Sequence, residues 1–210
     1  MKRLTLIFAM VAPMIAACGH IPLTSLPDLA RIDFMTTDPA LIRAALRAPA
    51  ELQPAAERST MMVTVRIGDD APVLHKLALQ RIEDPSELGA LARYQQQGRR
   101  LFAFRLTPAD ALRMAELRRN ILARKSEGKR GSLSIAISPE TCRLSESPPG
   151  PVLVDSYIRT SELQTYVALT RNIDLRNVEG KDVAALIPPC DQQPASTPSG
   201  KSQARHPSSA

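Results

Sequence analysis

Hydrophobic and polar residues alternate with a period of two along most of the chain. Residues 60–68 carry four apolar side chains on one face of this pattern, those of Met61, Val63, Val65 and Ile67. The same alternation recurs in residues 73–82, 101–106, 131–138, 151–160 and 166–175. Alternation of this kind is typical of a β-strand with one buried face. The pattern therefore predicts a series of short strands.

One segment follows the helical period instead. Thr107 stands at an N-cap position and Pro108 at the first helical position. Asp110 completes a capping box, and Gly128 follows the end of the segment. The apolar side chains fall on one stripe, formed by Ala111, Met114, Leu117, Ile121 and Leu122. We expect a helix at about 108–126 that packs this stripe against a sheet.

Clusters of Gly, Pro and Asp separate the predicted strands. This punctuation favours antiparallel connections over a wound α/β sheet. The predicted fold class is mainly β: an antiparallel β-sandwich-like domain with one long amphipathic helix, about 108–126, packed on it. An α+β fold is the alternative.

Residues 39–48 fit two kinds of element. Asp38 followed by Pro39 resembles the start of a helix. Within the segment, however, apolar residues alternate with arginines as in a strand, in the order Ile42, Arg43, Ala44, Leu46 and Arg47. Pro49 and Pro54 leave little room for a helix, so a strand is favoured.

The N-terminus has the three parts of an export signal. Lys2 and Arg3 form a basic head, residues 4–17 are apolar, and two small residues, Ala16 and Ala17, end the apolar run. As a helix, about fourteen residues span only ~21 Å, which is short of the ~30 Å hydrocarbon core of a bilayer. The segment is therefore predicted to be a signal peptide that is removed during export.

The apolar run ends on the stretch IAAC, from Ile15 to Cys18. This stretch resembles the lipobox of bacterial lipoproteins, in which the cysteine is diacylated and becomes the N-terminus after cleavage. The resemblance covers residues 1–19 and implies a lipid anchor on Cys18, since two or three acyl chains hold a protein on a membrane without a spanning helix. In such lipoproteins an aspartate after the cysteine favours the inner membrane. Gly19 stands there, which implies the periplasmic face of the outer membrane.

Composition divides the rest of the chain into a folded middle and two polar ends. Pro22 and Pro27 lie in a stretch that is predicted to be a tether. The last residues, DQQPASTPSGKSQARHPSSA, have almost no apolar side chains to offset their ordering entropy, so disorder is expected there. The predicted organisation is a signal peptide at 1–17, a lipidated tether at 18–30, a single globular β-rich domain at 31–190 and a disordered tail at 191–210.

Two cysteines, Cys142 and Cys190, remain once Cys18 carries lipid. In an oxidising compartment a leftover pair predicts a disulfide. The bridge would close a loop of about fifty residues, worth ~4 kcal/mol in the chain-entropy model. Two unrelated free thiols are the alternative.

Charge and composition exclude several kinds of partner. The chain has 27 Lys and Arg against 21 Asp and Glu, and loss of Lys2 and Arg3 with the signal leaves 25 against 21, a net charge of +4. This mild excess does not indicate nucleic-acid binding. Aromatic residues make up 3% and tryptophan is absent, so stacking platforms for bases or sugars are scarce. The histidines, His20, His75 and His206, are dispersed without metal-ligand spacing, so neither a metal nor a cofactor is predicted.

Basic residues are dense in and after the predicted helix. The candidate patch comprises Arg118, Arg119, Arg124 and Lys125. One interpretation is a solvated face that complements the helix dipole. The other is a surface that meets an anionic envelope polymer, phospholipid head groups or an acidic envelope protein.

The sequence supports two functional hypotheses. The favoured one is a membrane-anchored periplasmic lipoprotein with a non-enzymatic binding, scaffolding or envelope-assembly role. The alternative is an envelope hydrolase whose site forms only in the fold, with His75 beside a serine or a carboxylate in a concave pocket. The chain has neither a G-x-S-x-G elbow nor a phosphate-binding G-x-x-x-x-G-K-[ST] loop, and no catalytic residue is assigned.

Overall fold

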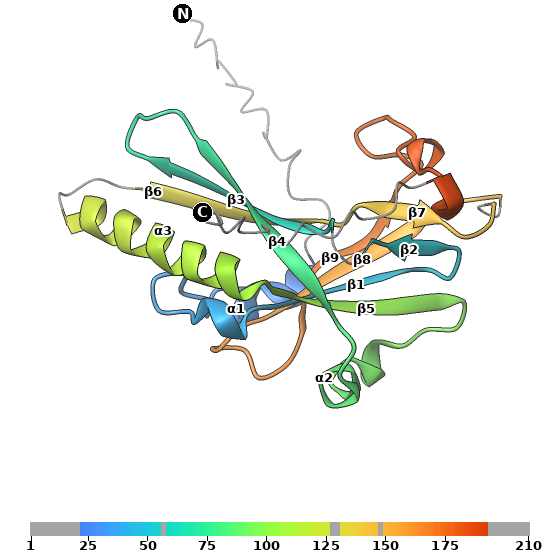
Figure 1. Ribbon diagram of the computed structural model, residues 1–210, viewed down its shortest axis with the longest axis horizontal. Coiled ribbons are helices and arrows are strands. Elements are labelled where there is room, and N and C mark those ends of the chain that lie inside the picture. Colours follow the sequence, from blue (N-terminus) through green and yellow to red (C-terminus); the bar gives the residue numbers. More distant parts are fainter. Residues whose placement is uncertain (1–21, 56–57, 127–130, 147–148, 193–210) are drawn as a thin grey trace, which may run out of the picture.

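The computed structural model describes residues 22–55, 58–126, 131–146 and 149–192 (Figure 1). Within these ranges the strands are β1 (Arg43–Pro49), β2 (Leu52–Pro54), β3 (Thr60–Ile67), β4 (Val73–Ile82), β5 (Arg99–Leu106), β6 (Gly131–Ser138), β7 (Thr141–Arg143), β8 (Leu153–Arg159) and β9 (Val167–Asp174). The α-helices are α1 (Leu26–Leu29), α2 (Pro85–Gly89) and α3 (Pro108–Ser126). Short 3-10 helices are η1 (Leu23–Ser25), η2 (Pro39–Leu41), η3 (Ala92–Tyr94), η4 (Ala184–Leu186) and η5 (Cys190–Gln192).

Seven of the described strands form one antiparallel sheet in the order β6-β3-β4-β5-β1-β8-β9, and β2 pairs with β7 in a second, small sheet. Strand β4 belongs to both halves of the large sheet, because residues 73–78 pair with β3 and residues 79–82 pair with β5. In Figure 1 this strand crosses the molecule between the two halves. The sheet is curled, so its edge strands β6 and β9 border the same interior space.

The mainly β class is confirmed, as is the long helix packed on the sheet. Strand β3 lies in residues 60–68, β4 coincides with 73–82 and β6 with 131–138, while β5, β8 and β9 fall on the other alternating segments. The two halves face one another as in a sandwich. They nevertheless form one sheet, because β4 is long enough to pair in both halves.

The ambiguous segment 39–48 contains a short helical turn followed by a strand. The Asp38 side chain accepts a hydrogen bond from the Ala40 amide, and η2 ends after a single turn. Strand β1 then pairs with β5 on one side and with β8 on the other. The strand prediction is confirmed, because hydrogen bonding to two neighbours prevails over the local helix-start signal.

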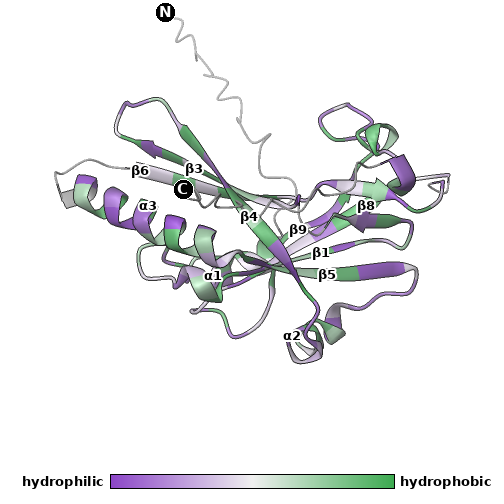
Figure 2. Cartoon of the chain, in the orientation of Figure 1, coloured by the Kyte–Doolittle hydropathy of each residue, from purple (hydrophilic) through white to green (hydrophobic). Residues whose placement is uncertain are grey.

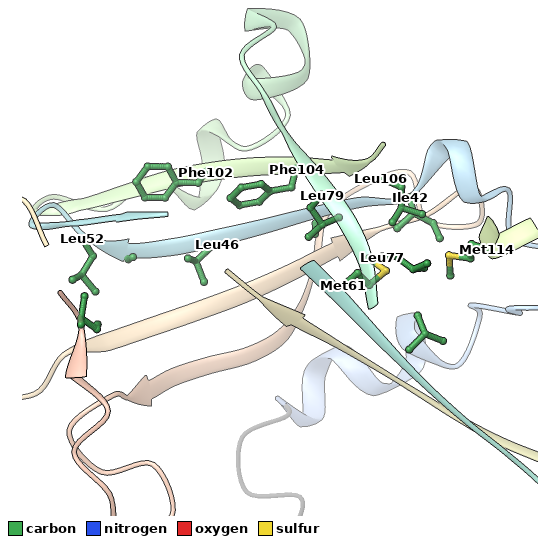
Figure 3. Close-up of a cluster of buried hydrophobic side chains, with 14 of the residues drawn as sticks. Ile42, Leu46, Leu52, Met61, Leu77, Leu79, Phe102, Phe104, Leu106 and Met114 are labelled. Atoms are coloured by element: carbon green, nitrogen blue, oxygen red, sulfur yellow. The ribbon is translucent and has the colours of Figure 1, made fainter. Parts of the chain in front are cut away.

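The inner face of the curled sheet holds the larger hydrophobic core. Leu46, Phe102 and Phe104 project into it from neighbouring strands, as Figure 3 shows, with Leu52 at one end and Met114 at the other. All of these side chains are buried. The alternation seen in the sequence therefore directs one side of each strand into a shared aliphatic and aromatic interior.

Helix α3 closes one end of this interior. Thr107 caps the helix start, since the Asp110 amide donates to Thr107 Oγ1 (3.2 Å) and Thr107 Oγ1 donates to Asp110 Oδ2 (2.9 Å). The other half of the predicted capping box is replaced by a bond to the sheet, because the Thr107 amide donates to the Ala78 carbonyl (3.1 Å). The Asp110 carboxylate accepts from the Ala78 amide of β4 (3.0 Å), which fixes the helix start to the sheet. Met114 is 1% exposed and the stripe packs on the core, but Leu122 is 42% exposed because the stripe drifts away from the sheet. Figure 2 shows the alternating polar and apolar bands of the helix.

The outer face of the central strands is covered by the segment that contains α2 and η3. Leu91 and Tyr94 of this segment pack against Ala45 and Tyr157 of the sheet. The rings of Tyr94 and Tyr157 lie 4.8 Å apart in a tilted arrangement. This second, smaller core fills the space between that segment and the sheet.

The described chain begins inside the stretch assigned to the tether. Residues 22–30 form η1 and α1, and Leu29 packs against Ile158 and Leu163. Residues 1–21 and 193–210, with the signal peptide, the lipobox and most of the tail, lie outside the described residues. The predictions made for them remain predictions.

Candidate functional site

The two edge strands of the large sheet border one open cavity of about 470 Å³, which we call the edge cavity. Strand β6 lines one wall, and β8 and β9 line the opposite wall. Residues Leu46, Ala48 and Leu52 form its floor. Helix α3 contributes no lining residue, since it covers the other end of the interior. The cavity is thus the part of the inner face that no described helix fills.

The lining of the edge cavity is almost entirely apolar. It includes Ile135, Ile137, Val154, Leu169, Ile173, Leu175, Val183, Leu186 and Ile187. Its polar side chains are the hydroxyls of Thr141, Ser156 and Thr170. Ser156 Oγ and Thr170 Oγ1 lie 2.7 Å apart and share a hydrogen bond. An uncharged ligand with little need for hydrogen bonds fits this lining best.

Asp155 also borders the edge cavity, but its carboxylate binds groups on the outer face. Register pairs Asp155 with Arg47 and Ser156 with Leu46, so alternate residues of β8 point to opposite faces. Asp155 Oδ2 accepts from Arg47 Nε (2.7 Å) and lies 2.8 Å from Arg99 Nη1. Its other oxygen accepts from the Asn172 amide (2.7 Å). The negative charge is therefore neutralised outside the cavity.

A second ionic cluster lies on the outer face. Glu87 bridges Arg43 and Arg159 at 3.1 Å and 2.7 Å. Burial alone would raise the pKa of Glu87, but hydrogen bonds from the two guanidinium groups, together with their charges, hold this pKa below its ordinary value. Burial raises the pKa of Tyr166 beside this cluster and that of Tyr157 beside Asp155. The ion pairs of Glu87 with Arg43 and Arg159 join α2 to the sheet.

The C-terminal part of the domain covers the edge cavity through a strap, residues 183–188. Val183, Leu186, Ile187 and Pro188 line the cavity. The predicted disulfide is confirmed: Cys142 and Cys190 are bonded, with Cα atoms 4.8 Å apart. The Arg143 amide donates to the Pro188 carbonyl (2.9 Å) beside it. The disulfide therefore holds the strap against β7.

The candidate basic patch divides into residues with different roles. Arg118 Nη1 donates to the Thr37 carbonyl at 2.6 Å, so this side chain links α3 to the loop before η2. Arg124 pairs with Asp70 at 3.4 Å, and both side chains are exposed. Arg119 is exposed, while the Lys125 side chain lies outside the described set. Among the described side chains of the patch, Arg118 and Arg124 are thus engaged within the protein, and Arg119 faces solvent.

His75 lines a smaller cavity of about 210 Å³ between α3 and β4, together with Asp70, Asn120 and Arg124. Asp70 is paired with Arg124, and within the described part of the chain no carboxylate or hydroxyl is hydrogen-bonded to His75. The base and nucleophile contact that the hydrolase hypothesis requires is therefore not formed by these residues. No catalytic role is assigned to His75.

The sequence did not point to the edge cavity. Its walls come from strands far apart in the chain, and the strand segments that supply them show the same alternation as the other predicted strands. One available signal was the small residue Ala48 among large apolar residues, which leaves room on the floor. Another was the uncharged run GSLSIAIS of β6, because edge strands usually carry charges or prolines that block pairing.

Two absences concern the described ranges alone. Among these residues no helix has the length and hydrophobicity needed to cross a membrane. No cluster of three or more His, Cys, Asp or Glu side chains that could hold a metal ion occurs there either.

No protein-family model, curated protein or solved structure matches the chain.

Proposed function

We propose that the chain is a lipid-anchored protein on the periplasmic face of the outer membrane, with a non-enzymatic binding role. The observation that carries the binding role is the edge cavity. At about 470 Å³ it is more than twice the volume of the cavity beside His75, and it is bordered by strand edges and a strap instead of being filled by core side chains. Large apolar cavities with a few convergent polar groups are the usual form of a ligand site.

The proposed location rests on the lipobox resemblance at Ile15 to Cys18. The Cys142–Cys190 disulfide is in keeping with it, because disulfides persist in oxidising compartments such as the periplasm. Acyl chains on Cys18 would keep the domain at the membrane surface, where apolar molecules are concentrated. A surface-held domain with an apolar cavity is suited to take up, hold or present such molecules.

Anchoring is tested with the full chain in cells. Labelled palmitate should enter the wild-type protein and fractionate with outer membranes, whereas Cys18→Ser should abolish labelling and leave the precursor uncleaved. Cys142→Ser is the matched control, because it removes a cysteine without touching the lipobox and should keep the label. Equal labelling of the Cys18→Ser protein would overturn the proposed anchor.

Binding is tested with the chain from residue 18 to residue 210 carrying Cys18→Ser, exported by a plain secretory signal so that the disulfide forms. This chain contains every described residue. An uncharged dye whose fluorescence rises in apolar surroundings should bind it at one site. Ile173→Glu, which places a carboxylate in the cavity wall, should reduce that binding at least tenfold, because burying an unpaired charge is costly. Equal binding of the dye by the parent chain and by Ile173→Glu would show that the edge cavity is not the binding site.

A further inference from the structure

The ligand class follows from the size and lining of the edge cavity. We propose that the cavity holds one acyl chain of a diffusible membrane lipid. This inference rests on the proposed binding function and names its ligand. It is carried by the volume of the cavity, by a lining whose one charged residue, Asp155, is ion-paired on the outer face, and by the proposed use of the Cys18 lipid as the membrane anchor.

The volume suits a single chain. A dry cavity of about 150 Å³ accommodates a benzene ring, which is on the order of 25 Å³ per carbon atom. The edge cavity, at about 470 Å³, is three times as large. On the same scale it has room for roughly 18 or 19 chain carbons. One acyl chain of ordinary membrane length fills it, and two do not fit.

The lining suits a hydrocarbon. Ile135, Ile173 and Leu175 are typical of its walls, and the Ser156 and Thr170 hydroxyls already bond to one another. The nearest carboxylate, that of Asp155, is bound by Arg47 and Arg99 on the outer face. Because nothing inside would compensate a charge, the head group of the lipid stays in water and only the chain enters.

The segments of this chain are poorer occupants. The tail at 193–210 has almost no apolar side chains. The lipid on Cys18 is inserted in the membrane in the proposed anchoring, so it is not free to fill the edge cavity. The tail is unsuited to the cavity by composition, and the Cys18 lipid is excluded by its role as the anchor.

An added peptide strand meets an irregular edge on one wall. The pairing of β9 with β8 contains register shifts between Val154 and Ser156 and between Ser156 and Tyr157. Asn172 of β9 has φ 53°, which turns the strand away from extended geometry. Irregular edges of this kind hinder strand addition. An acyl chain forms no backbone hydrogen bonds, so the irregular edge of β9 does not hinder its binding between the two walls.

The test uses the unlipidated chain described above and a fluorescent C18 fatty acid as the bound probe. Saturated alkanoates from C8 to C22, kept below their micelle concentrations, compete with the probe. Affinity should rise about threefold to fourfold for each methylene added, as expected for burial of a CH₂ group, and should stop rising near C18 to C20. A dependence on length that ends at a cut-off is the signature of a closed-ended cavity.

Two cavity variants and one control sharpen the result. Val154→Phe adds four carbon atoms to the wall, so the cut-off should fall by about four carbons while shorter alkanoates still bind. Ile173→Glu should weaken every alkanoate at least tenfold. Leu112→Glu makes the same change at a side chain that is 73% exposed on α3, and it should leave the whole series unchanged. Thermal unfolding of each variant shows that it folds.

The possible results distinguish failure of the proposed acyl-chain ligand from failure of the proposed binding function. Alkanoates could fail to compete while the uncharged dye, or an apolar strand-forming peptide, still binds the wild-type chain and binds Ile173→Glu less well. The proposed acyl-chain ligand would then be wrong, and the proposed binding function would stand. If neither dye, peptide nor alkanoate binds, both fail. If the unlipidated chain binds the probe but the lipidated protein does not, the lipid on Cys18 occupies the cavity. That result would overturn the proposal that the ligand is a diffusible lipid.

Discussion

At the scale of single residues, Asp155 is the position at which we expect a substitution to destabilise the fold most. Its side chain is 1% exposed and is held by Arg47, Arg99 and the Asn172 amide. Breaking a buried ion pair by removing one partner costs far more than breaking an exposed one, because the remaining charge has no compensation. The outer face of the sheet therefore depends on this carboxylate.

We expect Asp155→Asn to lower the free energy of unfolding by about 3 kcal/mol, because it leaves Arg47 and Arg99 with uncompensated charge. Asp70→Asn is the matched control. Asp70 pairs with Arg124 at the surface, so its loss should cost no more than about 0.5 kcal/mol. Urea unfolding of the unlipidated chain measures both. Equal effects of the two substitutions would show that burial does not determine the strength of the Asp155 cluster.

Asp155 also shows what residue patterns can reveal. In the sequence it interrupts the apolar run of residues 151–160, and nothing nearby in the chain identifies its partners. Arg47 and Arg99 become neighbours only because β1 lies between β5 and β8. Strand identity could be predicted from alternation, but the partners of a buried charge depend on strand order, which alternation does not contain.

At the scale of elements, local signals were sufficient where each element carries its own pattern. Helix α3 has its capping threonine, its proline and its apolar stripe within one segment, and the structure gives Pro108–Ser126. Strands β3, β4 and β6 likewise follow their alternation. The predicted basic patch on α3 is different, because the function of an arginine depends on what lies across from it.

We expect Arg118→Gln to lower the free energy of unfolding by about 1 kcal/mol, because the Arg118 guanidinium donates to the carbonyl of the buried Thr37 and its loss leaves that acceptor without this donor. Arg119→Gln should cost no more than a few tenths of a kcal/mol, since the side chain is exposed and the two residues have similar helix propensity. Urea unfolding distinguishes the two. Similar costs would mean that the link from α3 to the loop before η2 does not stabilise the fold.

The same pair of variants addresses the anionic-surface hypothesis. If α3 meets anionic vesicles, Arg119→Gln should weaken retention of the unlipidated chain at low salt and the difference should shrink as salt is raised. No retention of the parent chain would leave α3 with a structural role alone.

At the scale of the whole molecule, the curl of the sheet creates the proposed site. The curl arises because β4 pairs in both halves, and it brings β6 and β9 to the same cavity although five strands separate them in the sheet. Helix α3 fills one end of the enclosed space and the disulfide-held strap borders the other. Neither strand alternation nor cysteine count could have predicted how much of this space remains open.

This arrangement predicts how the molecule opens. Central strands β1 and β5 have partners on both sides, whereas β6 and β9 each have one. Edges and short connecting segments open at lower free energy than central strands. Amide exchange of the unlipidated chain should therefore be slowest in β1 and β5 and faster in β6 and the strap, residues 183–188.

A bound acyl chain should change that order at specific places. A ligand that binds only the closed form stabilises it by RT ln(1 + [L]/Kd), about 2.7 kcal/mol at a hundredfold excess over Kd. Saturating alkanoate should thus slow exchange in β6, β9 and the strap, which line the edge cavity, and leave the exposed C-terminal turns of α3 unchanged. Leu112→Glu should keep this protection and Ile173→Glu should lose it. Protection confined to α3, or spread evenly over the sheet, would place the ligand outside the edge cavity, because only occupation of that space contacts both edge strands and the strap at once.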